Sequence, residues 1–142
     1  MINKTLVYER LSFICDALKR LESYSRIEPG QFPGSDQAAA AESYLRRALE
    51  AMFDIGRHLL SKLGETDLAA EYKSIASGLQ KRQIVTAELG AKLFEMAGYR
   101  NRLVHFYHHV TDEELYQILQ HDLDDIRQFI SEVKAFMAAN GC

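Results

Sequence analysis

The chain has 142 residues, of which 47% are hydrophobic and 26% are charged, and its formal net charge is −3. This length and composition exclude a fibrous or disordered protein and predict a single folded domain over residues 1–142. The acidic balance also argues against a surface that binds nucleic acid broadly, so phosphate contacts would need a local basic patch.

No apolar run approaches the ~18–20 residues that span a bilayer. Glu9 and Arg10 interrupt the start of the chain, where a signal peptide stays apolar. We therefore expect a cytoplasmic protein with no membrane contact. Cys15 and Cys142 form no Cys-x-x-Cys pair and have no histidine at zinc-finger spacing, so we expect free thiols in a reducing compartment.

The first half of the chain predicts two long helices. Over residues 3–27 the apolar positions alternate steps of four and three, which is the spacing of one helical stripe. Residues 28–36 hold both prolines and predict a loop, with Ser35 or Asp36 as the N-cap of the next helix. The second helix is expected to end at Gly64, a residue type favoured just after a helix.

The second half predicts three more helices. A short one is expected from residue 66 or 67 to Gly78, and a fourth covers roughly 83–106. The fifth starts at a capping box, in which Thr111 and Glu114 satisfy each other's backbone amides, and continues through Met137. With short connections and no segment of period two, the sequence predicts an all-α antiparallel bundle of about five helices.

The segment Arg100–His109 is the main candidate for chemistry. It gathers two arginines and three of the five histidines with no acidic residue, and it lies where the fourth helix must end before Thr111. A cationic cluster with no compensating carboxylate suits a phosphate ligand, which arginine binds through two parallel hydrogen bonds.

Two other charged groups are weaker candidates. The pairs Arg46–Arg47 and Lys81–Arg82 would extend a phosphate-binding surface, although surface helices often carry such pairs. The acidic cluster of the fifth helix is expected to be a solvated face, and its members are Asp122, Asp124 and Asp125.

Helical geometry limits how the residues of the segment can combine. Asn101 and His105 lie four apart on one face, and Arg102 is three before His105. Arg100 and Tyr107 share a different face. If Arg100, His105 and Tyr107 act together, the helix must unwind between His105 and Tyr107, or two subunits must contribute; we expect both.

A metal site is not expected. His105 and His109 have the spacing that lets two imidazoles share an ion. However, none of the five histidines follows a glutamate by three residues, so the Glu-x-x-His motif of di-iron bundles is absent. We therefore expect neither a functional metal nor another cofactor.

The string Arg100-x4-His105-x-Tyr107, with Asn101 after the arginine, resembles the signature of HepT-like proteins in the HEPN superfamily of helical RNA-cleaving and nucleotide-binding domains. The similarity extends over 44–58, which resembles the family's second helix, and over 96–123. The resemblance implies a HEPN-like fold and a dimeric, metal-independent endoribonuclease that acts as the toxin of a two-gene toxin–antitoxin system.

The resemblance also implies a partner and residue roles. The partner would be a minimal nucleotidyltransferase antitoxin that transfers AMP to Tyr107. Arg100 and His105 would be catalytic, and Asn101 matches a frequent polar position of the motif. We expect Asn101 and Arg102 to be supporting residues. The histidines that follow, His108 and His109, are expected to be loop residues or RNA contacts.

The implied chemistry is physically coherent. RNA carries its own nucleophile, the 2′-hydroxyl, and His105 has an ordinary pKa near 6.5, so it can accept or donate a proton. Arg100 can stabilise the negative charge that develops at phosphorus. A homodimer supplies two histidines, one as base and one as acid.

Two other function classes remain open at this point. One is a non-catalytic nucleotide-binding HEPN module that partners a nucleotidyltransferase, which the acidic net charge favours. The other is a purely structural helical dimer, which accounts for the apolar stripes but leaves the basic cluster unexplained. The Arg100-x4-His105 pair favours the ribonuclease.

Overall fold

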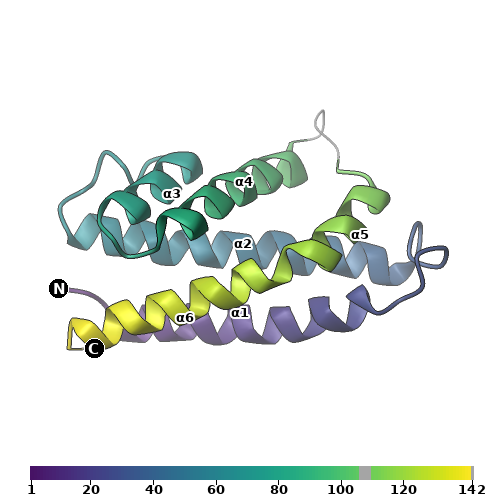
Figure 1. Ribbon diagram of the computed structural model, residues 1–142, viewed down its shortest axis with the longest axis horizontal. Coiled ribbons are helices and arrows are strands. Elements are labelled where there is room, and N and C mark those ends of the chain that lie inside the picture. The colour runs from purple at the N-terminus through teal and green to yellow at the C-terminus, as the bar shows by residue number, and fades with distance from the viewer. Residues whose placement is uncertain (106–109, 142) are drawn as a thin grey trace.

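The computed structural model describes residues 1–105 and 110–141. They form six α-helices and no strand: α1 (Lys4–Ser25), α2 (Asp36–Lys62), α3 (Tyr72–Lys81), α4 (Ala87–Val104), α5 (Asp112–His121) and α6 (Leu123–Ala139). The long helices α1, α2, α4 and α6 run back and forth side by side (Figure 1). This confirms the predicted all-α antiparallel bundle. In the described residues no helix is long and apolar enough to cross a membrane.

Side-chain caps start four of the six helices. In each, an oxygen of the N-cap side chain accepts a hydrogen bond from the backbone N–H three residues further on, which satisfies an amide that has no partner inside the helix. Ser35, one of the two predicted caps, has this role in α2, which ends as expected before Gly64 at φ +85°. The four caps are Asn3, Ser35, Thr86 and Thr111.

The predicted fifth helix is two helices in the structure. The break falls at Asp122, which ends α5 and precedes α6. The apolar spacing continues across it from Leu119 to Leu123, so periodicity alone does not show it. The acidic residues Asp124 and Asp125 occupy the first turn of α6, where the helix dipole favours negative charge. That arrangement is the sequence signal for the new helix start.

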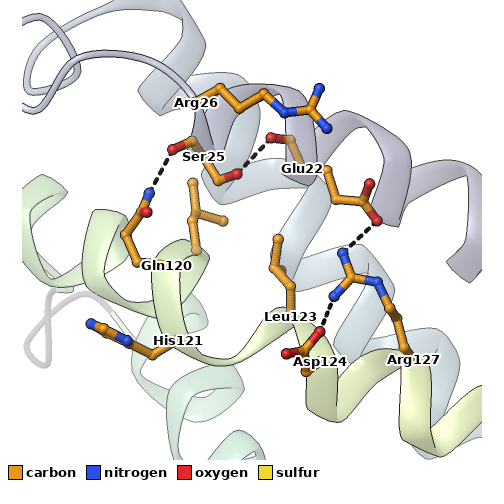
Figure 2. A pocket seen from close by; sticks show the side chains of 9 residues that line it. Glu22, Ser25, Arg26, Gln120, His121, Leu123, Asp124 and Arg127 are labelled. Carbon is orange, nitrogen blue, oxygen red and sulfur yellow. Dashed lines mark hydrogen bonds and ion pairs between the residues drawn. The ribbon is translucent and has the colours of Figure 1, made fainter.

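Contacts with α1 hold the corner between α5 and α6. Gln120 donates from Nε2 to the carbonyl oxygen of Ser25 at 2.6 Å, and Arg127 donates to Glu22 at 2.7 Å and also to Asp124 (Figure 2). Tyr116 donates its hydroxyl to a carbonyl oxygen of the α1–α2 connection. Helix α5 therefore packs on that connection, while α6 returns along α1.

The third helix also differs from its prediction. It begins at Tyr72 and runs past Gly78 to Lys81, so Gly78 is not a stop signal. A Cβ atom on Gly78 would come within 2.9 Å of Leu60, and one on Gly56 within 2.6 Å of Ile75. These glycines let α2 and α3 pack closely, which is why a glycine lies inside a helix here.

The fourth helix is shorter than the predicted 83–106. It starts after the Thr86 cap, because Gln83 has φ +59°, a conformation that helices exclude. It ends at Val104, and His105 has extended backbone angles of φ −96° and ψ 117°. The segment Arg100–His109 thus leaves the helix at His105.

Candidate active site

The candidate site lies at the C-terminal end of α4. Arg100, Asn101 and Arg102 belong to the last turns of the helix, and His105 is its C-cap. The backbone N–H of His105 donates to the carbonyl oxygen of Asn101 at 3.1 Å, and the His105 side chain is exposed. The expected unwinding therefore begins one residue earlier than predicted, at His105 itself.

Arg100 points toward α2 and α3. Its Nη2 donates to Oε2 of Glu50 at 3.1 Å, and its guanidinium carbon lies 4.4 Å from the centre of the Tyr72 ring. The side chain keeps 25% of its surface exposed, yet its Nε is buried and has no hydrogen-bond partner among the described residues. Arg100 is thus held in place, while one of its donors has no partner in the part of the chain that the structure describes.

Arg102 points the other way, toward α5. Its two terminal nitrogens donate to the two carboxylate oxygens of Glu114 at 2.6 and 2.7 Å. This pairing raises the pKa of Arg102, because it stabilises the charged guanidinium. Thr111 accepts from the Glu114 amide at 3.1 Å as predicted, while the Glu114 carboxylate, expected to turn back to Thr111, binds Arg102.

These pairs correct one sequence-based interpretation. The segment has no acidic residue of its own, but the fold brings Glu50 of α2 to Arg100 and Glu114 of α5 to Arg102. The arginines are therefore compensated by carboxylates from distant parts of the sequence. Glu50 and Glu114 lie too far from the segment in the sequence to be identified as its partners from the sequence alone.

Three of the predicted site residues, Tyr107, His108 and His109, lie outside the described residues, as does Cys142. Within residues 1–105 and 110–141, no group of three or more His, Cys, Asp or Glu side chains is arranged to hold a metal ion. Cys15 is a free thiol in this part of the chain.

The weaker candidates are distributed over other surfaces. Arg46 pairs with Glu50 at 3.1 Å, so it borders the site, whereas Arg47 lies over the rings of Phe13 and Tyr44. Arg82 pairs with Glu65 at the far end of α3. Arg46 and Arg100 share Glu50, so a carboxylate lies between these two arginines.

The predicted acidic face is only partly solvated. Asp124 is on the surface, but Asp122 and Asp125 are half-buried, and burial is the main cause that raises the pKa of both carboxyl groups. Burial also raises the pKa of the Tyr99 hydroxyl, and the charge of Asp122 adds to this shift.

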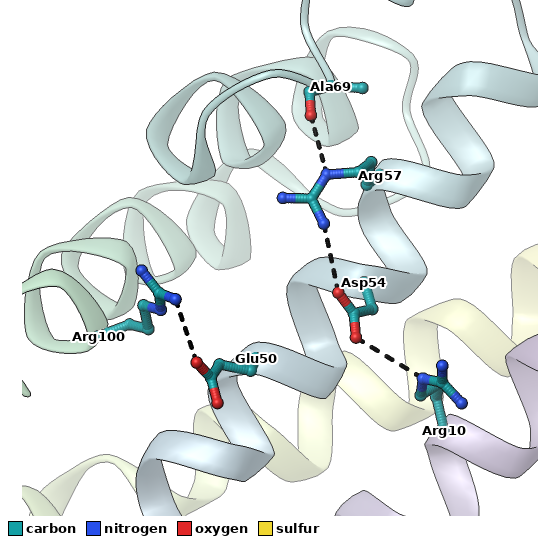
Figure 3. A network of polar contacts seen from close by, with 6 residues as sticks. All are labelled: Arg10, Glu50, Asp54, Arg57, Ala69 and Arg100. Atoms are coloured by element: carbon teal, nitrogen blue, oxygen red, sulfur yellow. Dashed lines mark hydrogen bonds and ion pairs between the residues drawn. The ribbon is translucent and has the colours of Figure 1, made fainter. Parts of the chain in front are cut away.

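Sequence analysis missed three residues that shape the site, namely Glu50, Arg57 and Tyr72. Tyr72 stacks on Phe53 with ring centres 4.7 Å apart, and the Arg57 guanidinium carbon lies 5.6 Å from the Tyr72 centre. Arg57 also donates to the carbonyl oxygen of Ala69 and to Asp54 (Figure 3). The sequence did hold a signal for Glu50 and Arg57: with Arg46, they are spaced four and seven residues apart, which places three charged residues on one side of α2.

The bundle and the Arg100–His105 pair at a helix end define a HEPN-type helical domain. A solved structure of tri-AMPylated Shewanella oneidensis HEPN toxin in complex with MNT antitoxin matches the chain with a TM-score of 0.81 and 25% identity. The match covers 94% of this chain and 98% of the other.

The chain belongs to the Ribonuclease HepT-like family, whose model matches residues 14–133. It is 26% identical over 137 residues to tRNA nuclease HepT of Aphanizomenon flos-aquae, covering 96% of this chain and 92% of that protein. It is 30% identical over 91 residues to mRNA nuclease HepT of Shewanella oneidensis, covering 64% of this chain and 68% of that protein. The predicted membership of the HepT-like family is thereby confirmed.

Proposed function

We propose that the chain is the ribonuclease toxin of a toxin–antitoxin pair, and that it cleaves RNA without a metal ion through Arg100 and His105. The relatives named tRNA nuclease and mRNA nuclease support the substrate class. The observation that carries the residue assignment is the placement of Arg100, which is held by Glu50 and Tyr72 with 25% of its side chain exposed, near the end of α4 where the His105 side chain is exposed.

In the proposed reaction the 2′-oxygen of a ribose attacks the adjacent phosphorus. His105 of one subunit accepts the 2′-hydroxyl proton, and the bond from phosphorus to the 5′-oxygen of the next nucleotide breaks. The partner's His105 donates a proton to that leaving oxygen. The products are a 2′,3′-cyclic phosphate and a 5′-hydroxyl, with no oxidant, water or metal consumed.

Arg100 has the electrostatic role in this reaction. Its guanidinium stabilises the additional negative charge on the phosphoryl oxygens as the new bond forms. We assign Asn101 and Arg102 supporting roles. Arg102 fixes the end of α4 through Glu114, and Asn101 lies beside Arg100 on the open side of the helix.

The exposed face of α4 supports the proposed homodimer. Phe94, Gly98 and Asn101 recur at steps of four and three, so they share one face of the helix, and His105 follows as its C-cap. Phe94 is 45% exposed, and a Cβ atom on Gly98 would meet nothing within 4 Å. Two copies of this face packed about a two-fold axis would bring both His105 residues into one cleft.

Light scattering tests this assembly. The expected mass is twice the 16.2 kDa of the chain. A monomer at micromolar concentration would exclude the mechanism with two histidines.

The antitoxin is proposed to be a minimal nucleotidyltransferase that inactivates the toxin at Tyr107. The tyrosine oxygen attacks the α-phosphorus of ATP, AMP becomes attached and pyrophosphate leaves. The tri-AMPylated HEPN toxin seen with MNT antitoxin supports this form of control. The attached phosphodiester would place a negative charge beside Arg100, where it would compete with the RNA phosphate for the same guanidinium.

Intact-mass spectrometry tests the modification site. After incubation with the antitoxin, ATP and magnesium, the wild-type chain should gain one or more AMP units and lose RNA cleavage. Tyr107→Phe should gain none and stay active. AMP addition to Tyr107→Phe would place the acceptor elsewhere.

The decisive test of the function is cleavage of single-stranded RNA in EDTA. Wild-type protein should cut and leave 2′,3′-cyclic phosphate ends, whereas His105→Ala should be inactive with an unchanged melting temperature. Full activity of His105→Ala, or loss of wild-type activity with the chelator, would contradict the proposal. RNA binding without cleavage would favour the nucleotide-binding module.

A further inference from the structure

A hollow of about 440 Å³ opens beside Arg100, between α2, the start of α3 and α4. Its size is that of a small-ligand site. No sequence motif pointed to it, because its walls come from three separate helices. The residues that line it are Arg57, Ala70, Glu71, Tyr72, Lys73, Arg100 and Asn101.

The charge of the hollow is its first informative property. Arg57, Lys73 and Arg100 reach it from α2, α3 and α4, while Glu71 is the only acidic residue among those that line it. Lys73 lies 5.2 Å from the centre of the Phe94 ring and has no ion pair with a described carboxylate. Three cations converging on one open space in an acidic protein favour an anionic ligand.

The second property is the arrangement of the two guanidinium groups. Arg57 and Arg100 both lie over Tyr72, with their central carbons 5.6 and 4.4 Å from its ring centre. Figure 3 shows the two side chains extending toward one another above α2, each anchored by an acidic residue of that helix, Asp54 or Glu50. The buried Nε of Arg100 has no partner among the described residues. The arginines are therefore ordered before any ligand arrives.

The third property concerns the type of ligand. Tyr72 is stacked on Phe53 and also covered by Arg100, so its ring is already occupied and offers no open face to a nucleobase. Helix α3 starts at the hollow, and no side chain of the described residues caps its first amides, so its dipole adds to the positive potential there. These features fit a phosphate group rather than a base.

We propose that this hollow binds a backbone phosphate of the RNA strand next to the phosphate that is cleaved. The inference rests on the proposed function, since Arg100 links the two positions. Arg57 and Lys73 would be binding residues, and neither would take part in the chemical step. Recognition through phosphate is independent of base sequence, so this contact positions the strand without selecting it.

Salt dependence of binding tests the proposal. The probe is a fluorescent single-stranded 2′-O-methyl RNA, which cannot be cleaved because its nucleophile is blocked. For single strands, each phosphate contact contributes about 0.7 to the slope of log Kd against log salt concentration. Lys73→Gln should lower this slope by about 0.7 and weaken binding about fourfold at physiological salt.

Two matched variants make the test specific. Lys134→Gln removes another exposed lysine, on α6, which does not line the hollow, and it should leave both slope and affinity unchanged. Glu71→Gln removes the acidic residue of the hollow and should tighten binding. Light scattering on all variants checks that none changes the oligomeric state.

The outcomes separate this inference from the proposed function. Unchanged slope and affinity in Lys73→Gln, with wild-type protein that binds and cuts RNA, would overturn the phosphate site alone. Equal weakening by Lys134→Gln would also overturn it, since the effect would then be one of net charge. Wild-type protein that neither binds nor cuts RNA would overturn both.

Discussion

Arg100 and Arg102 stand two residues apart at the end of α4, but they face different parts of the molecule. Arg102 and Glu114 form a pair in which both carboxylate oxygens accept from one guanidinium. Arg100 shares Glu50 with Arg46, rests on Tyr72 and keeps a buried donor without a partner in the described structure.

The difference shows how one basic cluster holds two kinds of arginine. The α5 side of α4 uses its arginine to fix the helix end against the next helix. The α2–α3 side holds its arginine at the edge of an open, positively charged hollow. Residue type and motif position alone do not distinguish these roles. The side chains that each arginine contacts distinguish them.

Among the variants that compare the two arginines, the largest expected effect comes from changing Arg100. Arg100→Lys keeps the charge but loses the planar fork, so kcat/KM for RNA cleavage in EDTA should fall about 100-fold or more. The melting temperature should stay close to the wild-type value, because lysine can still pair with Glu50. Activity within a few-fold of wild type would show that charge alone is enough.

Glu50 should have the next largest effect, because it orients Arg100. Glu50→Ala removes the acceptor and should lower cleavage about tenfold, the size expected for a hydrogen bond to a charged group. Glu50→Gln keeps a carbonyl acceptor and should retain most of the activity. Equal losses in the two variants would mean that the negative charge, rather than the orientation, is what Glu50 supplies.

Arg102 should behave in the opposite way and affect stability more than activity. Its side chain is 39% exposed and Glu114 is 34% exposed, so the pair is expected to contribute only about 1 kcal/mol to the free energy of unfolding. Urea denaturation of Arg102→Ala, Glu114→Ala and the double variant measures this coupling. Cleavage by Arg102→Ala should stay within a few-fold of wild type, and a 100-fold loss would make Arg102 part of the reaction.

The smallest effect lies far from the site, at His58. Burial, then Lys62 and the N-terminus, lower the pKa of His58 below its ordinary value of 6.5, and its Nε2 accepts from the Asn3 amide at 2.8 Å. The unfolded chain then binds the proton more tightly. The free energy of unfolding is therefore undiminished above pH 6.5 and decreases as the pH falls through the folded pKa.

Denaturation at about pH 7.5 and about pH 5.5 measures this contribution. His58→Gln keeps an acceptor for Asn3 without the titration, so it should lose less stability between the two pH values. Asp122 and Asp125, whose pKa values shift upward, remain in both proteins and cancel in the difference. Identical pH profiles would remove His58 as a source of acid sensitivity.

Local signals in the sequence predicted much of the fold. The Ser35 and Thr111 caps and the end of α2 before Gly64 all follow from residue preferences within one helical turn. The break at Asp122 was not predicted, because the apolar spacing continues across it and the acidic residues that mark the start of α6 were interpreted as a solvated face. The start of α3 at Tyr72 was not predicted either. Gly78 was interpreted as the end of a helix, because a glycine that allows close packing against Leu60 cannot be distinguished by residue type from one that ends a helix.

The candidate site was predicted to a similar extent. The segment that carries Arg100 and His105 was found from its composition, its place at a helix end and its motif. Glu50 and Tyr72 were not found, because they lie about 50 and 28 positions away from Arg100 and only the folded bundle brings them together.

The most direct test of the difference between the two arginines is an NMR titration that follows the Nε–H signals of Arg100 and Arg102. The ligand is the 2′-O-methyl RNA, which occupies the site without being cut. The account predicts that the Arg100 signal shifts, because a phosphate beside its guanidinium changes the surroundings of the Nε–H, while the Arg102 signal keeps its position on Glu114. A shift of Arg102 with Arg100 unchanged would contradict it.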